Sequence, residues 1–461
     1  MVIVNNNPVV PSVFALRTWS RFLPQRRTAR HDWRMTNAAL THRRIAARHG
    51  SVIVLCGFML VPAAATRAQT PPQSGQKTPG QTQADDYTRY ELLAPGSGKF
   101  RILYDVTATT PGAAQFFNPI RAGSIATDER VFDRATGKPL TFSVVSANVA
   151  RAGGVRVTDT TQRYIRVTLA HPVPTDGGEA RVLIDKTYED TKSYFVEGDA
   201  IVFNRPLGIK RNAVVLPKGY ELVSCNYPSQ VLQESDGRIA ISFWNATPAE
   251  APLVLRARPV SGLASAASAV ASRLDERARQ TREIVYFLQQ PETRAFDLYH
   301  DYTESRTGVD YYVNVVRGGS TVSSPSGRNL DSGELLKFDV LVGDAITRAN
   351  VGVSTVTPTT EAVVFRFAPV AAGASIRLRM SETYTDSVRY RLVNDELVWD
   401  RAFGRPANAV VLPAGWVLTN SVIPATVSTL PDGRVRLDFI NARPDEIATL
   451  ITARRRGVRS R

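Results

Sequence analysis

The feature that most constrains this fold is a short sequence segment, here called the repeated phrase, that occurs twice in the chain. Residues 212–222 read NAVVLPKGYEL and residues 408–418 read NAVVLPAGWVL, an offset of 196 positions. The same offset holds without gaps across 205–248, and it pairs the start of one unit (100–124) with the start of another (296–320). Solenoid repeats have periods of about 20–50 residues. A period this much longer predicts two tandem domains, each with its own core.

Both units consist of short runs in which apolar and polar residues alternate. Ile102, Tyr104 and Val106 are one such run. Alternation with a period of two indicates strands that bury one face, and Asp-Gly pairs at 236–237 and 432–433 supply tight turns between such runs. The predicted fold class is mostly β, with two tandem antiparallel β-sandwich domains joined by one amphipathic α-helix.

The stretch 262–289 departs from this alternation. Its apolar residues, among them Leu263, Val270 and Leu274, recur at steps of three and four, which is typical of one face of a helix. The predicted organisation follows. It comprises a signal peptide at 1–68, a disordered linker at 69–85, a β-sandwich repeat at 86–259, a linker helix at 260–290, a second β-sandwich repeat at 291–456 and a basic tail at 457–461.

The N-terminal residues predict export. The chain has 461 residues and a formal net charge of +15, but residues 1–68 hold ten arginines and one aspartate, so the remainder carries only +6. Within 1–68, basic residues precede the apolar run 51–65, and small residues ending at Ala68 follow it, which is the order of a secretory signal peptide. We expect cleavage after Ala68 and, from the length of the basic region, a true start at Met35.

Two other interpretations of this segment are weaker. A membrane span needs about 20 apolar residues, and a lipid anchor at Cys56 needs a small residue where Leu55 stands. After cleavage Cys225 is the only cysteine, so the mature chain forms no intramolecular disulfide. Export without disulfides fits a bacterial envelope protein. The predicted location is the periplasm, the outer surface or the extracellular medium.

The mature sequence contains few residues suited to catalysis. Its only histidines are His171 and His300, and it lacks the HExxH, GxSxG and P-loop motifs. We therefore expect no metal and no cofactor. The best acid–base set is His300, Asp301 and Glu304, although in a strand His300 and Asp301 point to opposite faces.

A second group of candidates is polar residues that occur in both units. They have two interpretations: a ligand surface present twice, with arginine gripping a carboxylate or phosphate, or residues that each copy needs in order to fold. The structural interpretation is favoured, because internal repetition selects what both copies require. The possible ligand-surface residues are Arg121, Arg317, Arg205, Arg401, Tyr188 and Tyr384.

One segment resembles a known family. The pattern of YIRVTLAHPVPTDGGEARVLIDKTY (164–188), which recurs loosely at 362–384, resembles the N-terminal β domain of M1-family aminopeptidases. The resemblance implies two copies of a non-catalytic accessory fold, since those enzymes carry their zinc motif in a separate domain. The segment YFLQQPETRAFDLYHDYTES (286–305) is similar to uncharacterised exported bacterial proteins, which implies no function.

The sequence favours an exported, non-catalytic cell-envelope protein with a binding or scaffold role. The expected partner is an envelope protein or a glycan, with no nucleic acid and no transmembrane span in the mature chain; the oligomeric state stays open. The alternative is a hydrolase whose site lies in a cleft between the domains and uses His300, Asp301 and Glu304. The two hypotheses differ in whether those three side chains converge.

Overall fold

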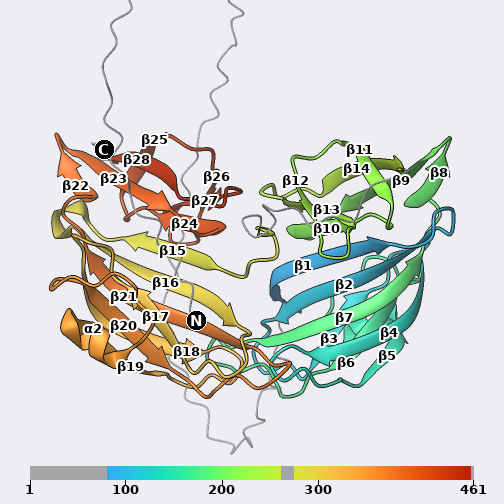
Figure 1. The fold of residues 1–461 in the computed structure, drawn as a ribbon, viewed down its shortest axis with the longest axis horizontal. Coiled ribbons are helices and arrows are strands. Elements are labelled where there is room, and N and C mark those ends of the chain that lie inside the picture. Colours follow the sequence, from blue (N-terminus) through green and yellow to red (C-terminus); the bar gives the residue numbers. More distant parts are fainter. Residues whose placement is uncertain (1–79, 261–274, 458–461) are drawn as a thin grey trace, which may run out of the picture. The chain divides into compact units, whose positions relative to one another are not determined.

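The described chain contains one set of strands twice. The computed structural model describes residues 80–260 and 275–457. Strands β1 to β14 of the first copy recur in the same order as β15 to β28 of the second copy, and most equivalent strands begin 196 positions apart. The repeat in sequence is therefore also a repeat in structure (Figure 1).

The first copy contains β1 (Gln83–Leu92), β2 (Lys99–Ala108), β3 (Gln115–Pro119), β4 (Ile125–Asp133), β5 (Phe142–Ser146), α1 (Ala147–Ala152), β6 (Arg163–Thr168), β7 (Ala180–Glu189), β8 (Tyr194–Glu197), β9 (Ala200–Leu207), β10 (Arg211–Val215), β11 (Tyr220–Cys225), β12 (Gln230–Gln233), β13 (Ile239–Trp244) and β14 (Ala251–Pro259). The second contains β15 (Glu283–Leu288), the 3₁₀ helix η2 (Pro291–Thr293), β16 (Ala295–Glu304), β17 (Tyr311–Val315), β18 (Thr321–Asn329), β19 (Lys337–Val342), α2 (Asp344–Ala349), β20 (Glu361–Arg366), β21 (Ile376–Thr385), β22 (Tyr390–Val393), β23 (Glu396–Phe403), β24 (Ala407–Val411), β25 (Trp416–Ser421), β26 (Thr426–Thr429), β27 (Val435–Ile440) and β28 (Ile447–Arg455).

Each copy has a seven-stranded sheet, in the orders β12-β13-β10-β1-β2-β7-β4 and β26-β27-β24-β15-β16-β21-β18. Neighbouring strands are antiparallel except for β1 with β10 and β15 with β24, which are parallel. The repeated phrase supplies β10 and β24. Every residue of β10 is buried, because Val214 joins the main core while Ala213 and Val215 pack on the opposite face. The Val-Val run of the phrase is thus a strand covered on both sides.

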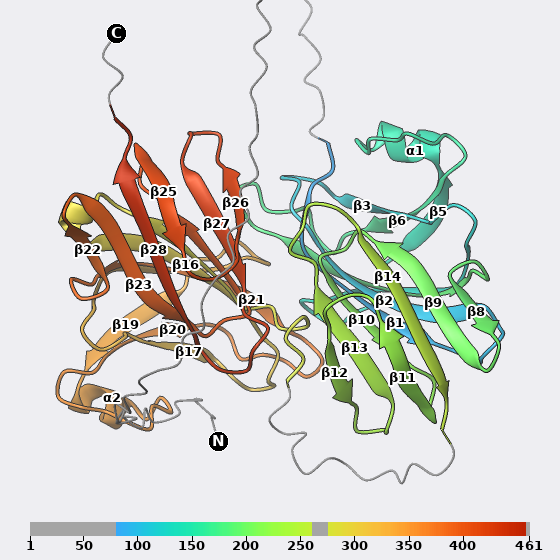
Figure 2. The ribbon, with the colours of Figure 1, turned by 90° about the horizontal axis from the view of Figure 1, so that it is seen from above.

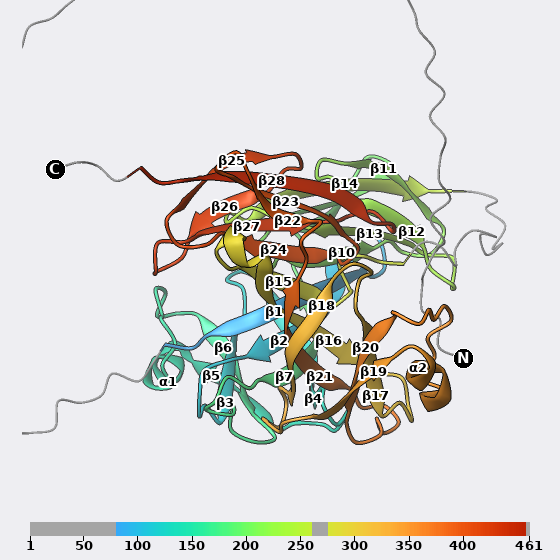
Figure 3. The ribbon, with the colours of Figure 1, turned by 90° about the vertical axis from the view of Figure 1, so that its left-hand side faces the viewer.

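Two smaller sheets complete each sandwich. In the first copy they are β11-β14-β9-β8 and β3-β6-β5, and in the second β25-β28-β23-β22 and β17-β20-β19. Figure 2 shows β11 and β14 beside β10 and β13. One core in the first copy takes side chains from all three sheets, with Phe100 and Phe203 in edge-to-face contact at 5.4 Å. The helices α1 and α2 lie against β5 and β19 respectively (Figure 3). The fold is mostly β and consists of tandem sandwiches, as predicted.

A buried ion pair connects the two copies. Arg181 on β7 donates two hydrogen bonds to the carboxylate of Asp331, at 2.6 and 2.8 Å, and one to the carbonyl oxygen of Ser375 at 3.0 Å. The backbone amide of Glu179 donates to the carbonyl of Leu330 at 2.8 Å. Because each of these bonds crosses from one copy to the other, polar groups at the ends of β7 and β21 are satisfied only when both copies are present.

The helix predicted over 262–289 is wrong for the part of that stretch that the structure describes. Residues 275–282 form turn and coil, and Glu283–Leu288 form β15, which pairs with β16 and β24. Residues 261–274 lie outside the described residues. The run Ile284 to Leu288 is apolar on consecutive positions because both faces of β15 are covered, with Tyr286 and Leu288 in the main core of this copy and Val285 in a separate cluster. Such a run also fits a helical stripe. The sheet supplies backbone partners on both edges, which decides the conformation.

The predicted linker, signal peptide and tail can also be compared with the residues that the structure describes. The linker predicted at 69–85 ends inside β1, which begins at Gln83, and its residues up to 79 lie outside the described residues, as does the whole predicted signal peptide. Of the predicted tail, Gly457 is in coil and the rest is outside the description. Within residues 80–260 and 275–457, no helix is long and apolar enough to cross a membrane.

Candidate functional site

The three predicted acid–base residues lie on β16 but do not face one another. His300 and Glu304 point to one face of the strand, whereas Asp301 points to the other and accepts two hydrogen bonds from Arg379, at 2.8 and 2.7 Å. All three side chains are buried. A substrate atom therefore has no single position from which it contacts all three groups.

Each member of the set also has its own structural environment. The Nδ1 atom of His300 lies 3.2 Å from the Tyr312 hydroxyl, and burial together with nearby arginines holds the pKa of His300 well below its ordinary value. Burial alone raises the pKa of Glu304, but hydrogen bonds from Arg306 outweigh it and lower that pKa. His300 is thus neutral and Glu304 ionised at neutral pH. This geometry does not favour the hydrolase alternative, which stays a prediction.

Two of the predicted ligand-surface arginines are core residues. Arg205 donates to the carboxylate of Asp190 at 2.9 Å, and Arg401 donates to Asp386 at 3.1 Å at the equivalent position. Each guanidinium lies over a core ring, Phe100 at 5.4 Å in the first copy. Buried ion pairs that both copies contain belong to the scaffold, so neither arginine is available to a ligand in solution.

The remaining predicted ligand-surface residues divide between core and surface. The Tyr188 hydroxyl accepts from the backbone amide of Arg121 at 3.2 Å, and both Tyr188 and Tyr384 are buried. The guanidinium of Arg121 donates to the carbonyl of Pro206 at 3.1 Å, and Arg317 pairs with Glu446 at 2.8 Å. Arg121, Tyr188 and Arg205 do come together, but around the core of the first copy, where Tyr188 and Arg205 are shielded from solvent.

The sequence comparison missed a buried charge that differs between the copies. Lys186 on β7 donates to Asn118 Oδ1 at 2.6 Å, whereas the equivalent residue Glu382 accepts from Asn314 Nδ2 at 2.6 Å. Burial lowers the pKa of Lys186 to about 7 and raises that of Glu382 to about 7. The alignment of the two copies already shows this difference, because Lys186 is matched with Glu382 in two strands whose apolar and polar residues otherwise alternate in the same way.

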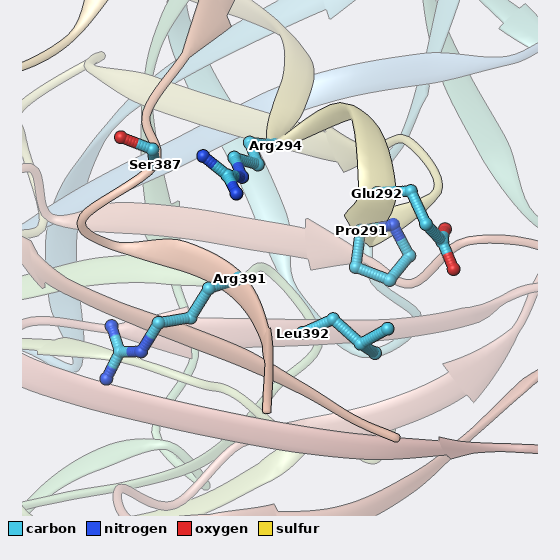
Figure 4. Close-up of a pocket in the computed structure, with 6 residues that line it drawn as sticks. All are labelled: Pro291, Glu292, Arg294, Ser387, Arg391 and Leu392. Atoms are coloured by element: carbon cyan, nitrogen blue, oxygen red, sulfur yellow. The ribbon is translucent and has the colours of Figure 1, made fainter. Parts of the chain in front are cut away.

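A shallow depression of about 520 Å³ occurs in the second copy, beside η2 and β22. Figure 4 shows the guanidinium groups of Arg294 and Arg391 and the Ser387 hydroxyl toward the left, and Pro291, Leu392 and the Glu292 carboxylate toward the right. Glu292 at its rim forms an ion pair with Arg455, whose guanidinium lies 4.8 Å from the Trp416 ring. The lining residues are Pro291, Glu292, Arg294, Ser387, Arg391 and Leu392.

A second feature of this copy is an apolar strip on β19. Phe338, Val340 and Val342 point to one face of this strand and are 41%, 45% and 52% exposed, and Leu335 just before it is 71% exposed. The strand is at the edge of its three-stranded sheet and pairs on one side only, with β20. Exposed apolar residues that gather on an unpaired edge strand are unusual and indicate an interaction surface.

Residues 80–260 and 275–457 contain no group of three or more His, Cys, Asp or Glu side chains arranged to hold an ion. Cys225, in β11, is partly buried, and its Sγ donates to the carbonyl of Tyr227 at 3.3 Å.

Comparison with known protein families and with curated protein sequences finds no match. Among solved structures, the chain is similar to the M1 zinc metallopeptidase from Deinococcus radiodurans, at 12% identity and a TM-score of 0.27, over 39% of this chain and 42% of that chain. It thus spans about two fifths of that enzyme's length. A protein from Parabacteroides distasonis matches at 10% identity and a TM-score of 0.23, over 81% of this chain and 93% of that chain. Collagen adhesin from S. aureus matches at 9% identity and a TM-score of 0.13, over 70% and 86%.

The fold itself defines the class of protein. The described chain is a tandem β-sandwich protein whose two copies share one buried ion pair, Arg205–Asp190 and Arg401–Asp386, and differ in what they expose.

Proposed function

We propose that this chain is an exported, non-catalytic protein of the cell envelope that binds a partner protein through the apolar strip of β19. One observation carries the proposal: the second copy exposes Phe338 and Val340, whose equivalents Phe142 and Val144 in the first copy are half-buried. Phe338 is 41% exposed and contacts the core of its copy through the ring of Phe365, at 6.0 Å between centroids, whereas the equivalent Phe142 is half-buried and packs on the core of the first copy. Because both copies fold in the same way, apolar residues that only one copy exposes are not explained by folding, and we attribute them to a function of that copy.

The reason for the exposure lies in the facing strand. Val131 on β4 is buried in the first copy, but its equivalent on β18 is Gly327. A Cβ at Gly327 would lie 2.6 Å from the ring of Phe365, so Phe365 fills the space that Val131 occupies in the other copy. Phe338 is consequently left at the margin of the sandwich, with solvent on its outer side.

The strip fits an extended segment with alternating apolar side chains. An edge strand has backbone N–H and C=O groups directed away from its sheet, which a further strand can pair with. Lys337 at one end of β19 and Asp344 just beyond the other end are exposed, and neither has a charged partner among the described residues. Opposite charges at the two ends favour one direction of a partner strand whose own end charges are complementary.

The test is site-specific photocrosslinking in cells. A photoreactive side chain at Val340 is expected to form a discrete adduct with another protein, and the adduct is expected to disappear when Phe338 is also changed to Ser. The matched control is Val427, which is 54% exposed on another edge strand, β26, and lies outside the strip. Equal labelling at both positions, or an adduct that consists of a second copy of this chain, would contradict a strip dedicated to a different protein.

Export is the second part of the proposal and rests on the order of basic, apolar and small residues at 1–68. Expression of the whole chain in a bacterium, followed by fractionation and N-terminal sequencing, is expected to give a mature protein that starts at Gln69. Recovery of uncleaved protein in the cytoplasm would contradict this part and leave the strip unaffected.

A further inference from the structure

The depression beside η2 contains an arginine where the backbone favours glycine. Arg294 has a φ of 55°, in the left-handed region, and the equivalent residue of the first copy is Gly98, with a φ of 65°. Side chains other than glycine are strained in this conformation. A chain that needed only the turn would keep the glycine, so the second copy accepts strain in order to place a guanidinium here.

A neighbouring difference makes room for that arginine. A Cβ at Gly98 would lie 2.7 Å from the Cγ2 methyl of Thr191. The second copy has Ser387 at the position of Thr191, and serine lacks that methyl group. The two differences are therefore coupled: the smaller residue removes the contact that the larger one would create. Both residues line the depression.

The positive charges that line the depression are not paired with carboxylates that line it. Arg391 is a second cation of the second copy, at the position of Phe195 in the first. Its guanidinium donates only to the carbonyl of Val388, and the guanidinium of Arg294 has no partner among the described residues. The one carboxylate in the lining, Glu292, is already paired with Arg455.

The loop that holds Arg294 is anchored to the core. The carbonyl oxygen of Arg294 accepts a hydrogen bond from the backbone amide of Asp386 at 2.9 Å. The Asp386 carboxylate in turn accepts hydrogen bonds from Arg389, at 3.0 Å, and from Arg401. This anchoring fixes the backbone from which the Arg294 side chain extends, so the binding of an anion orders that side chain and not the loop as well.

We propose that this depression binds a carboxylate-bearing sugar of an acidic polysaccharide. Two guanidinium groups and the Ser387 hydroxyl offer donors that match carboxylate and hydroxyl oxygens. Pro291 and Leu392 on the other side offer an apolar surface for the face of a pyranose ring. An open depression, unlike an enclosed cavity, lets a polymer continue in both directions. This site is separate from the β19 strip and does not depend on a protein partner there.

Titration calorimetry of the mature protein with an oligogalacturonate tests the proposal, with its methyl-esterified form and a glutamate-rich peptide as the other two ligands. We expect binding of the free acid that weakens as salt rises, and at least about tenfold weaker binding of the neutral ester, because charge-assisted hydrogen bonds are lost. Tighter binding of the peptide, or equal binding of acid and ester, would overturn the assignment of a sugar carboxylate.

The key variant is Arg294→Gly, which restores the residue of the first copy. It is expected to weaken oligogalacturonate binding at least about tenfold while unfolding at the same or a higher temperature, since it relieves the strained backbone. Arg391→Phe is expected to weaken binding similarly. Arg156→Gly, which removes an exposed arginine from a loop of the first copy, is the control and should leave binding unchanged. Unaltered binding by Arg294→Gly overturns the site, and the crosslink at β19 reports separately on the proposed function.

Discussion

At the scale of residues, the most informative site is the buried charge that changes sign between copies. Lys186 and Glu382 occupy equivalent positions, and each is hydrogen-bonded to an asparagine, Asn118 or Asn314. An asparagine amide has an acceptor oxygen on one side and a donor nitrogen on the other. The same residue type therefore satisfies an ammonium in one copy and a carboxyl group in the other by turning its amide over. The duplication tolerates opposite charges because its asparagine serves both.

The Glu382 side chain predicts a pH-dependent stability. Burial raises its pKa from 4.5 to about 7 in the folded protein. A carboxyl group whose folded pKa is raised contributes its full stability below the unfolded pKa, and that contribution is lost as the pH rises through the folded value. Glu382→Gln keeps the shape of the protonated form without ionising. It is expected to match the wild-type protein at pH 4 and to exceed its free energy of unfolding by about 3 kcal/mol at pH 8.

Urea denaturation at the two pH values measures this difference, and Glu250→Gln, at an exposed position, is the control. A difference between Glu382→Gln and the wild-type protein that is the same at pH 4 and pH 8 would show that Glu382 does not titrate in this range.

At the scale of elements, the repeated phrase combines a buried strand with a turn. The alternation and the Pro-Gly pair predict these parts correctly, since Gly219 and Gly415 have φ values of 80° and 84°. The parallel pairing of β10 with β1 and of β24 with β15 was not predictable from the phrase. When both faces of a strand are covered, its apolar and polar residues no longer alternate, so the sequence does not show which face points to the core or how the strand pairs. For the same reason β15 resembled part of a helix.

Gly415→Ala tests the turn. No atom lies within 4 Å of a Cβ at this position, so the substitution adds backbone strain and no collision. We expect a loss of about 1 kcal/mol in the free energy of unfolding. The matched variant is Gly318→Ala, at a glycine that also has open space around it but no positive φ, and it should cost nothing. Equal losses in the two variants, measured by urea denaturation, would contradict the role given to the turn.

At the scale of the whole molecule, the two copies are joined by a buried pair that neither contains alone. Arg181 belongs to the first copy and Asp331 to the second, and the Asp331 carboxylate also accepts from the backbone amide of Arg377 at 2.8 Å. Both side chains of the pair are 8% exposed. Removal of one partner from such a pair leaves a buried charge without its counterion, which costs more than the intact pair contributes.

Asp331→Ala is therefore expected to lower the free energy of unfolding by about 3–5 kcal/mol. The surface pair Arg443 and Asp445 provides the comparison, because Asp445→Ala removes a carboxylate that is in contact with water and should leave the unfolding midpoint unchanged. Calorimetry of the mature protein measures both variants. If Asp331→Ala unfolded like Asp445→Ala, the pair would not hold the copies together.

The candidate sites show where prediction from sequence ended. The offset of 196 pairs Arg205 with Arg401 and Tyr188 with Tyr384, and all four side chains are buried, although the sequence also allowed them to form a ligand surface. The strand rule correctly separated His300 from Asp301. The depression at Arg294 was not foreseen, because its members come from two segments far apart in the sequence, 291–294 with η2 and 387–392 with β22, which only the fold brings together.

The sequence by itself determined the duplication, the β class and the positions of the turns, since these depend on local periodicity and on glycine at positive φ. Only the tertiary structure decided which polar residues lie inside, that β15 is a strand, and that β19 is left uncovered. The physical reason is that burial depends on what packs against a strand from a distant part of the chain. Val131 and Gly327 occupy equivalent places in their strands, and the space around each decides whether a neighbouring phenylalanine belongs to the core or to the surface.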